Sequence, residues 1–228
     1  DGIDLYFRNK NQADRIQTFV SSALPVKIST SKKVVGRDVR SNENRTEFVS
    51  SIEVAPYCRG DLVVESNRLM LVDRLTSSLK LVDPCTGETC ERGTNRLFSK
   101  KHSPVRVLTA GPQLVTFLVM DVDVDVDVDE VRGGVAVASV DAGAVSGGAS
   151  GIVATATVVR ESDFGSNDNS FQVRTHLGGI LQPGDTALGY DMAHVVHSSA
   201  LESLVGPLVE NSQDIILVRK TYPDALKN

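Results

Sequence analysis

Hydrophobic and polar residues follow a clear order along the first quarter of the chain. Residues 3–8 alternate between apolar and polar, with Ile3, Leu5 and Phe7 in phase, and this pattern predicts a strand. Apolar side chains then recur at helical spacing over residues 13–24, and Pro25 is expected to end that helix. Two more strands are predicted over residues 26–35 and 46–55, joined by a polar loop. Residues 1–57 are therefore expected to form a small β-α-β-β segment.

The pattern changes to short apolar runs between residues 58 and 110. Three strands are predicted, at residues 62–65, 71–75 and 78–82. Asp83–Gly87 is a turn, because Pro84 fixes its own φ and Gly87 tolerates a positive φ. The polar, basic stretch from Arg92 to Arg106 is expected to be an irregular exit. Short strands joined by tight turns are typical of a small barrel, so we expect an SH3-like barrel over residues 58–110.

The last part of the chain, residues 111–228, predicts five strands and one short helix. The strands are expected at residues 114–120, 152–160, 171–175, 186–190 and 214–219, and the helix near residues 200–204. A stretch rich in Gly, Ala and Ser, near residues 131–151, is expected to be an insertion. Five strands with one short helix fit an OB-like barrel. The predicted fold class is therefore α+β, mostly β, with the β-α-β-β segment followed by the two barrels.

Composition narrows the kind of protein. With 41% hydrophobic and 23% charged residues the chain is an ordinary globular sequence, and no apolar run is long enough for a membrane helix. The chain begins with Asp1 rather than Met, and we expect it to be an internal part of a longer protein. Its three cysteines, Cys58, Cys85 and Cys90, form no CxxC pair. This argues for a reducing compartment and against a zinc site within this stretch.

The net charge of −5 depends on one acidic run. Val and Asp alternate from Asp121 to Asp129, and Glu130 follows. On a strand, alternate side chains lie about 6.6–6.8 Å apart, too far for carboxylates to surround a calcium ion. We therefore expect a solvated strand face that discourages edge pairing. The remaining charges nearly balance, so the acidic total does not exclude a local nucleic-acid surface.

Basic residues form two clusters and one pair that could neutralise phosphates. The first cluster comprises Lys27, Lys32, Lys33, Arg37, Arg40 and Arg45, and the second comprises Arg92, Arg96, Lys100, Lys101 and Arg106. Arg174 and His176 are two residues apart, so on a strand they would point the same way. Solvated basic loops with no RNA contact are an equally good interpretation from sequence alone.

Catalytic and metal-binding patterns are weak. No nucleophile elbow, phosphate loop, HExxH motif or pair of catalytic carboxylates is present in the sequence. His194 and His197 could share a helix face, but two imidazoles alone make a weak zinc site, and exposed histidines are the simpler interpretation. A hydrolase centred on His176 and Asp185 stays open as an alternative without a nameable substrate.

Several short motifs, in order, carry a resemblance to a known family. They are Asp4-Leu5-Tyr6-Phe7, Ser41-Asn42 leading into Val54-Ala55-Pro56, Leu81-Val82-Asp83-Pro84, Arg174-Thr175-His176-Leu177-Gly178, Pro183-Gly184-Asp185, Leu188-Gly189-Tyr190-Asp191 and Leu217-Val218-Arg219-Lys220-Thr221-Tyr222. With these motifs the chain resembles the NMD-three family of adaptors for export of the large ribosomal subunit. The family fold is an α/β segment, an SH3-like barrel and an OB-like barrel, the last two similar to translation factor five-A.

The resemblance implies a ribosome biogenesis factor and not an enzyme. It would be an adaptor for nuclear export of the pre-60S subunit, bound to rRNA on the intersubunit face, at the tRNA exit site near the L1 stalk. Arg219 and Lys220, in the last motif, join the RNA-binding candidates. Other assembly factors are implied as partners, together with the exportin Crm-one, which would read a signal downstream of this chain.

The same resemblance implies a protein that shuttles between nucleus and cytoplasm without a membrane partner. Zinc is expected only upstream of this chain, and no cofactor is expected within it. The alternative function is a translation-factor-like module that acts on mature ribosomes. The Asp83–Gly87 hairpin lacks the lysine that such a factor would modify, which counts against this alternative.

Overall fold

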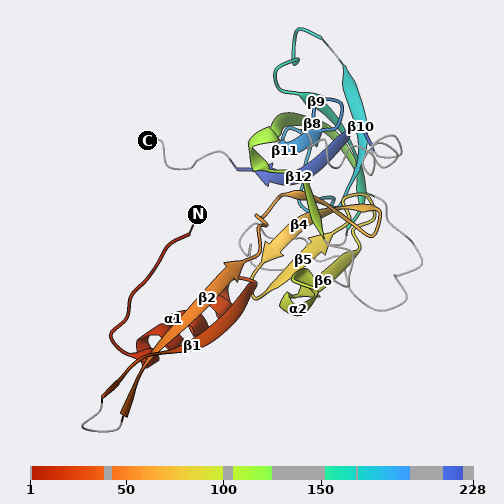
Figure 1. Ribbon diagram of the computed structural model, residues 1–228. Coiled ribbons are helices and arrows are strands. Elements are labelled where there is room, and N and C mark those ends of the chain that lie inside the picture. The colour runs from red at the N-terminus through yellow and green to blue at the C-terminus, as the bar shows by residue number, and fades with distance from the viewer. Residues whose placement is uncertain are drawn as a thin grey trace.

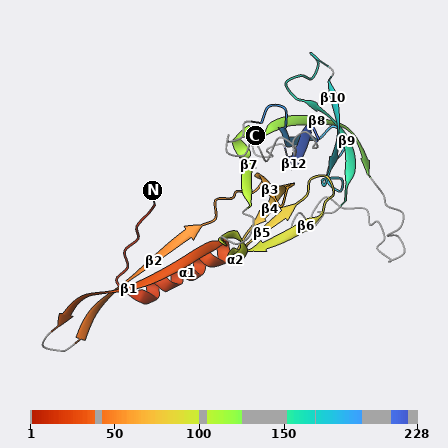
Figure 2. The ribbon, with the colours of Figure 1, turned by 45° about the vertical axis from the view of Figure 1, so that its right-hand side comes forward.

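The fold of the chain is α+β and mostly β, as the sequence predicts. The computed structural model describes residues 2–38, 43–99, 105–124, 152–167, 169–195 and 213–222. Its strands form three antiparallel sheets: a two-stranded ribbon β1-β2, a central sheet ordered β6-β5-β4-β3-β7, and a C-terminal sheet ordered β10-β9-β8-β11-β12. The ribbon projects away from the other two sheets, which pack against each other (Figures 1 and 2). This arrangement makes an elongated molecule with one two-sheet body.

The ribbon consists of β1 (Val26–Asp38) and β2 (Glu43–Val54), with α1 (Lys10–Ala23) lying along it (Figure 1). Both strands and the helix lie where the sequence predicts them, and each strand extends a few residues further toward the hairpin tip. The predicted stripe of α1 is half-buried, whereas none of its residues is fully buried. Gln17 Nε2 donates a hydrogen bond to Ser50 Oγ at 3.1 Å, which places α1 on the ribbon face that carries Ser50.

The predicted strand at residues 3–8 is wrong. Residues 2–7 have no regular secondary structure, and Ile3, Leu5 and Phe7 are 88%, 62% and 39% exposed. A strand is stabilised by hydrogen bonds to a neighbouring strand. Residues 2–7 pair with no strand that the structure describes, so their alternation alone does not produce one.

The central sheet contains β3 (Leu62–Glu65), β4 (Arg68–Leu75) and β5 (Ser78–Val82), all predicted from their apolar runs. All four residues of β3 are buried. Val63 packs in one hydrophobic cluster, whereas Leu62 and Val64 pack in another, so β3 is covered on both faces. This double burial explains why β3 is a continuous apolar run rather than an alternating one.

The stretch from Arg92 to Arg106 is more regular than predicted. Its ends lie in β6 (Thr89–Gly93) and β7 (Arg106–Thr109), the two edge strands of the central sheet, and α2 (Thr94–Leu97) follows β6 directly. β6 is polar, with three of its five residues exposed and none fully buried. Its pairing with β5 is therefore decided by backbone hydrogen bonds and not by an apolar face.

The C-terminal sheet begins after a short 3₁₀ turn, η1 (Gly111–Gln113). Its strands are β8 (Val115–Val124), β9 (Ala154–Arg160), β10 (Ser170–Thr175), β11 (Thr186–Asp191) and β12 (Ile215–Thr221), close to the five predicted. The first residues of the acidic run belong to β8, where Asp121 and Asp123 are exposed, as expected for a solvated face. The rest of the run, the insertion near residues 131–151 and the helix predicted near residues 200–204 lie outside the described residues.

One hydrophobic cluster joins the central and C-terminal sheets. The central sheet contributes Leu62, Val64, Leu71, Val82 and Leu108, and the C-terminal part contributes Tyr190, Met192 and Ile216. Tyr190 is fully buried, and its hydroxyl donates a hydrogen bond of 2.9 Å to the Gly60 carbonyl oxygen. Burial raises the pKa of Tyr190 well above its ordinary value. The two sheets are therefore held in one orientation by a shared core and a buried hydrogen bond.

Neither described helix is long and apolar enough to cross a membrane.

Candidate nucleic-acid interface

The first basic cluster is divided between the two faces of the ribbon. Lys32 pairs directly with Phe48, so both lie on the face that α1 covers. Lys27 and Lys33 are out of phase with Lys32 and lie on the opposite face. Lys27 Nζ is 3.9 Å from Glu53 Oε2, an exposed pair of little energetic weight. The cluster therefore does not form one continuous basic patch.

Phe48 brings together two lysines that lie far apart in the sequence. The ammonium groups of Lys10 and Lys32 are 4.9 Å and 5.8 Å from the centre of its ring. Both cations stay exposed. Lys10 was not predicted as a contact residue, because only the packing of α1 on the ribbon places it beside Lys32. Arg40 and the side chains of Arg37 and Arg45 lie outside the described residues.

Two arginines of the second basic cluster share one buried carboxylate, whereas Arg106 is exposed. Glu65 is buried, and its Oε1 accepts a hydrogen bond of 2.5 Å from Arg92 Nε and lies 3.7 Å from Arg96 Nη2. The hydrogen bond to Glu65 raises the pKa of Arg92. Arg92 is thus held within the fold by its ion pair, whereas about half of the Arg96 side chain is exposed. Lys100 and Lys101 lie outside the described residues.

His176 lies in the junction of the two sheets and not on an exposed rim. It is 7% exposed, and a ring N–H donates to the Pro84 carbonyl oxygen of the Asp83–Gly87 hairpin. Burial lowers the pKa of His176 below 6.5, although the carboxylates of Asp73 and Asp83 and this hydrogen bond oppose the shift. A neutral, buried ring is poorly placed to meet RNA, so its contact is structural.

Arg174 points differently from His176. Its side chain is exposed, whereas its backbone N–H donates to Gln213 Oε1, and Gln213 Nε2 donates to the Arg174 carbonyl oxygen at 3.1 Å. Gln213 Nε2 also lies 2.7 Å from Cys85 Sγ at the hairpin tip. The amide of Gln213 therefore links the edge of β10 to the central sheet and leaves the Arg174 guanidinium outside.

The pair at the end of β12 has two different roles. Arg219 is exposed. Lys220 is mostly buried, with Nζ 2.6 Å from Asp185 Oδ2 and 3.3 Å from the Ile180 carbonyl oxygen. Asp185 Oδ2 also accepts the backbone N–H of Gln182. Lys220 thus fixes the turn before β11, and of the two residues only Arg219 is exposed.

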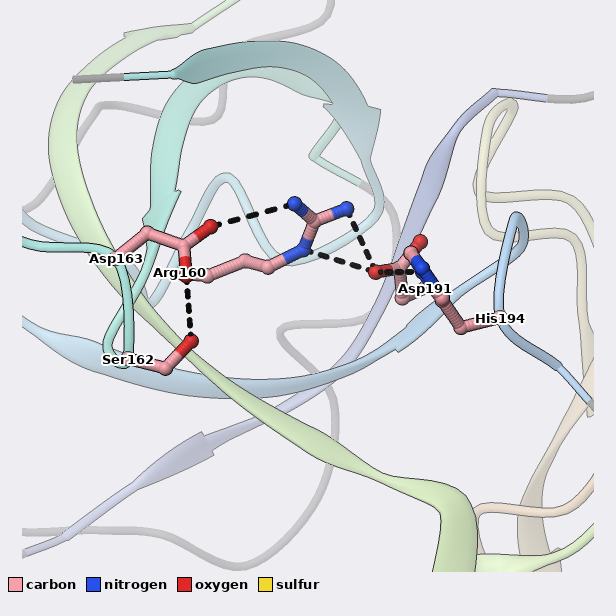
Figure 3. Close-up of polar contacts among 5 residues, drawn as sticks. All are labelled: Arg160, Ser162, Asp163, Asp191 and His194. Carbon is pink, nitrogen blue, oxygen red and sulfur yellow. Dashed lines mark hydrogen bonds and ion pairs between the residues drawn. The ribbon is translucent and has the colours of Figure 1, made fainter. Parts of the chain in front are cut away.

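A polar network that the sequence did not indicate closes one end of the C-terminal sheet. Figure 3 shows Arg160 between two carboxylates, with Nη2 2.7 Å from Asp191 Oδ2 and Nη1 3.4 Å from Asp163 Oδ2. His194 Nδ1 lies 2.9 Å from the same oxygen of Asp191. Arg160 also stacks on Phe171, with 4.8 Å from its guanidinium carbon to the ring centre. Asp163 and His194 follow their partners by three residues, whereas Arg160, Phe171 and Asp191 lie on β9, β10 and β11 and are brought together only by the fold.

Neither a catalytic pair nor a metal centre is assembled in the described ranges. His176 bonds to Pro84 and Asp185 to Lys220, so the two residues of the hydrolase alternative have separate partners. No group of three or more His, Cys, Asp or Glu side chains in those ranges could hold a metal ion. His197, the second histidine of the weak zinc pair, lies outside them. The two-sheet body exposes Arg96, Arg174 and Arg219, and the ribbon exposes Lys32 and Lys33. These cations can bind an anionic surface.

Two family models match the parts of the chain that carry this geometry. The model described as the NMD3 OB-fold domain matches residues 114–220, which span the C-terminal sheet, and the model described as NMD3, second domain, matches residues 1–54. The chain belongs to the NMD3 family. The resemblance carried by the ordered motifs is therefore confirmed, and the C-terminal sheet is an OB-fold.

Curated relatives match nearly the whole length of the chain. The 60S ribosomal export protein NMD3 of Dictyostelium discoideum is 32% identical over 98% of this chain and 40% of its own length. The proteins of the same name from Saccharomyces cerevisiae and Homo sapiens are 29% and 26% identical, each over 97% of this chain, and 40% and 43% of their lengths are covered. This NMD3 chain thus spans about two fifths of the curated relatives that it matches.

Proposed function

We propose that this NMD3 chain is the ribosome-docking body of a non-enzymatic adaptor for nuclear export of the 60S subunit. It would bind rRNA on the intersubunit face of the pre-60S particle, at the tRNA exit site near the L1 stalk. The proposal includes contacts with other assembly factors and shuttling between nucleus and cytoplasm, and it leaves the exportin contact to sequence outside this chain. Support comes from relatives whose name is 60S ribosomal export protein NMD3.

The observation that carries the proposal is the joined pair of sheets. Their shared cluster and the Tyr190–Gly60 hydrogen bond fix one sheet against the other. A rigid body loses less conformational entropy on binding than two tethered domains would. Such a body can match a structured RNA surface by shape, with cations neutralising nearby phosphates.

The exposed cations are the RNA-contact residues that the geometry favours. They are Lys32, Lys33, Arg174 and Arg219, with Arg96 as a partly exposed member. Arg92, His176 and Lys220 are held inside the fold by the partners described above. Arg37, Arg40, Arg45, Lys100, Lys101 and the paired Lys27 stay in the proposal as sequence-based candidates.

Salt dependence of binding to purified 60S subunits tests the RNA contact. We expect affinity to fall as salt rises, by about 0.9 log unit per decade for each phosphate neutralised in duplex-like RNA. The triple variant Lys32→Gln, Lys33→Gln, Arg219→Gln should bind more weakly and with a shallower salt slope. The control is Arg68→Gln, an exposed arginine already paired with Glu88 at 3.1 Å. Affinity that does not change with salt would show that the cations do not meet phosphate.

The translation-factor alternative is disfavoured by the position of the Asp83–Gly87 hairpin. Its backbone at Pro84 meets His176 and its Cys85 meets Gln213, so the tip packs against the OB-fold instead of projecting toward a partner. Sedimentation of cell extracts separates the two functions. An export adaptor should travel with free 60S particles, whereas a factor that acts on mature ribosomes would travel with polysomes.

A further inference from the structure

A hollow of about 860 Å³ lies where the ribbon meets the central sheet. One wall is the linker that leaves β2, with Pro56 and Tyr57. The other is β7 with the residues on either side of it, including Val105 before it and Pro112 after it. The lining is mostly apolar, and a hollow of this size can hold a short stretch of peptide. It is separate from the cations assigned above to RNA.

Asp61 lines this hollow with a carboxylate that is only half satisfied. The residue is 4% exposed. Its Oδ2 accepts a hydrogen bond of 2.7 Å from the Cys58 backbone N–H, whereas Oδ1 is buried and has no hydrogen-bond partner in the described chain. Leaving a buried carboxylate oxygen unpaired costs free energy. Because Oδ1 is enclosed by the protein, Asp61 shapes the wall of the hollow and is not a contact for an occupant.

The wall formed by β7 offers a free strand edge. In the described part of the chain β7 pairs with β3 alone and is the last strand of the central sheet. Alternate N–H and C=O groups of such a strand point away from its neighbour and can pair with an added strand. The Val105 carbonyl oxygen, just before β7, is already taken by the Tyr57 hydroxyl at 2.8 Å. The remaining edge therefore begins at Arg106.

Two exposed arginines, Arg59 and Arg106, stand at the rim of the hollow. Neither makes an ion pair with a described residue, unlike Arg68, Arg92 or Arg160 of the same body. Outside the acidic run the charges of the chain nearly balance, and these two cations make the rim locally positive. An occupant with acidic groups beside its apolar part would be complementary to it.

We propose that the hollow is a docking site for an extended acidic segment of a partner protein. The segment adds as a strand to the free edge of β7 and places one apolar side chain between Tyr57 and Pro112. Acidic residues on either side of the apolar one pair with Arg59 and Arg106. This mode of recognition combines main-chain pairing for affinity with a side-chain pocket for specificity.

A peptide fits this hollow better than RNA does. A nucleobase carries several polar edge atoms, and a mostly apolar lining would leave most of them without partners. An aliphatic or aromatic side chain has no such requirement. The proposal therefore goes beyond the rRNA contact, because its occupant is a protein.

Fluorescence anisotropy with short labelled peptides tests the proposal on the whole chain. Four probes share an extended Val/Thr-rich sequence with a central Leu, Ile, Phe or Met flanked by glutamates. We expect at least one to bind saturably, and Arg59→Glu with Arg106→Glu to weaken binding by about tenfold or more. Replacing the glutamates with lysines should restore binding to that double variant.

Matched variants separate the hollow from general surface effects. Gly111→Trp should fill it and abolish binding, since a Cβ built at Gly111 meets no heavy atom within 4 Å. Gly93→Trp, equally open but on the opposite edge strand, and the exposed Arg74→Glu should bind as the unchanged chain does. If Gly111→Trp lowers the melting temperature, Ala110→Trp at the same exposed rim replaces it.

Three results would overturn the proposal. They are the absence of saturable binding by all four peptides, peptide binding that the Arg59 and Arg106 reversals leave unchanged, and an RNA hairpin that binds and loses its affinity in those variants while the peptides do not bind. The last result would assign the hollow to RNA. Salt-dependent binding to 60S subunits would be unaffected by the first two, so failure here is distinguishable from failure of the proposed function.

Discussion

Gly189 lies where two backbones approach more closely than a side chain allows. A Cβ built there would be 2.8 Å from the Ile216 carbonyl oxygen, on the paired strand β12. Gly178 is similar, with Ala154 Cβ at 2.6 Å. Both glycines belong to the motifs that carried the family resemblance. Their presence has a physical reason, because neither the strand nor the barrel wall can move away without losing its pairing.

Gly189→Ala is expected to destabilise the chain by about 1–3 kcal/mol, because backbone atoms must shift to admit the methyl group. Gly111→Ala is the control, and its free energy of unfolding should change by less than about 0.5 kcal/mol, since its Cβ meets open space. Urea denaturation of the two variants measures the difference. Equal stabilities would contradict the close approach.

His176 makes stability depend on pH in a defined direction. Because burial lowers its pKa below 6.5, the unfolded chain binds a proton more readily than the folded one. The stability that neutral His176 contributes is therefore fully present above pH 6.5. It is lost as the pH falls through 6.5 toward the lowered pKa of the folded chain. The carboxylates of Asp73 and Asp83 limit the effect.

When the pH is lowered from 7.5 to 5.5, we expect the melting temperature of His176→Gln to fall less than that of the unchanged chain. Thermal melting across this range measures the two slopes. The control is Ser77→Ala, at an exposed position without an ionisable group, and it should keep the pH slope of the unchanged chain. Parallel slopes for all three proteins would mean that His176 is not the titrating group.

At the scale of elements, hydrogen-bonded pairing with a neighbouring strand decides whether a segment with an apolar–polar pattern becomes a strand. The run 62–65 became β3 because apolar clusters cover both of its faces. The equally regular alternation of residues 3–8 did not become a strand, because no described strand pairs with it. β6 is the converse case, a polar segment that is a strand because β5 supplies its hydrogen bonds. Strand formation thus depends on a partner that the local sequence does not specify.

The joint between β11 and the linker before β3 carries a testable contribution. Tyr190→Phe removes the hydroxyl that satisfies the buried Gly60 carbonyl oxygen, at a cost of about 1–3 kcal/mol. Urea denaturation should show this loss, whereas Tyr222→Phe, at a 58% exposed position, should change stability by less than about 0.5 kcal/mol. If Tyr190→Phe is neutral, the sheets are held together by apolar packing alone.

At the scale of the whole molecule, burial separates the basic residues into paired ones inside the body and exposed ones at the surface, a difference that composition does not show. Arg92, Arg160 and Lys220 compensate carboxylates inside the two-sheet body. Lys32, Lys33 and Arg219 remain at the surface, and Arg59 and Arg106 stand at a separate hollow. The molecule therefore offers two kinds of positive surface, one suited to phosphate and one suited to an acidic peptide. The salt series and the peptide series each address one of them.

The sequence by itself determined the family, the order of the three β-rich parts and most strands, because these depend on local alternation, turn residues and ordered motifs. Only the tertiary structure decided which basic residues are available. Arg92 is neutralised by Glu65, 27 residues away, and Tyr190 is bound to Gly60, 130 residues away. Ion pairing and burial arise between residues that folding brings together, so their free energies have no counterpart in the spacing along the chain.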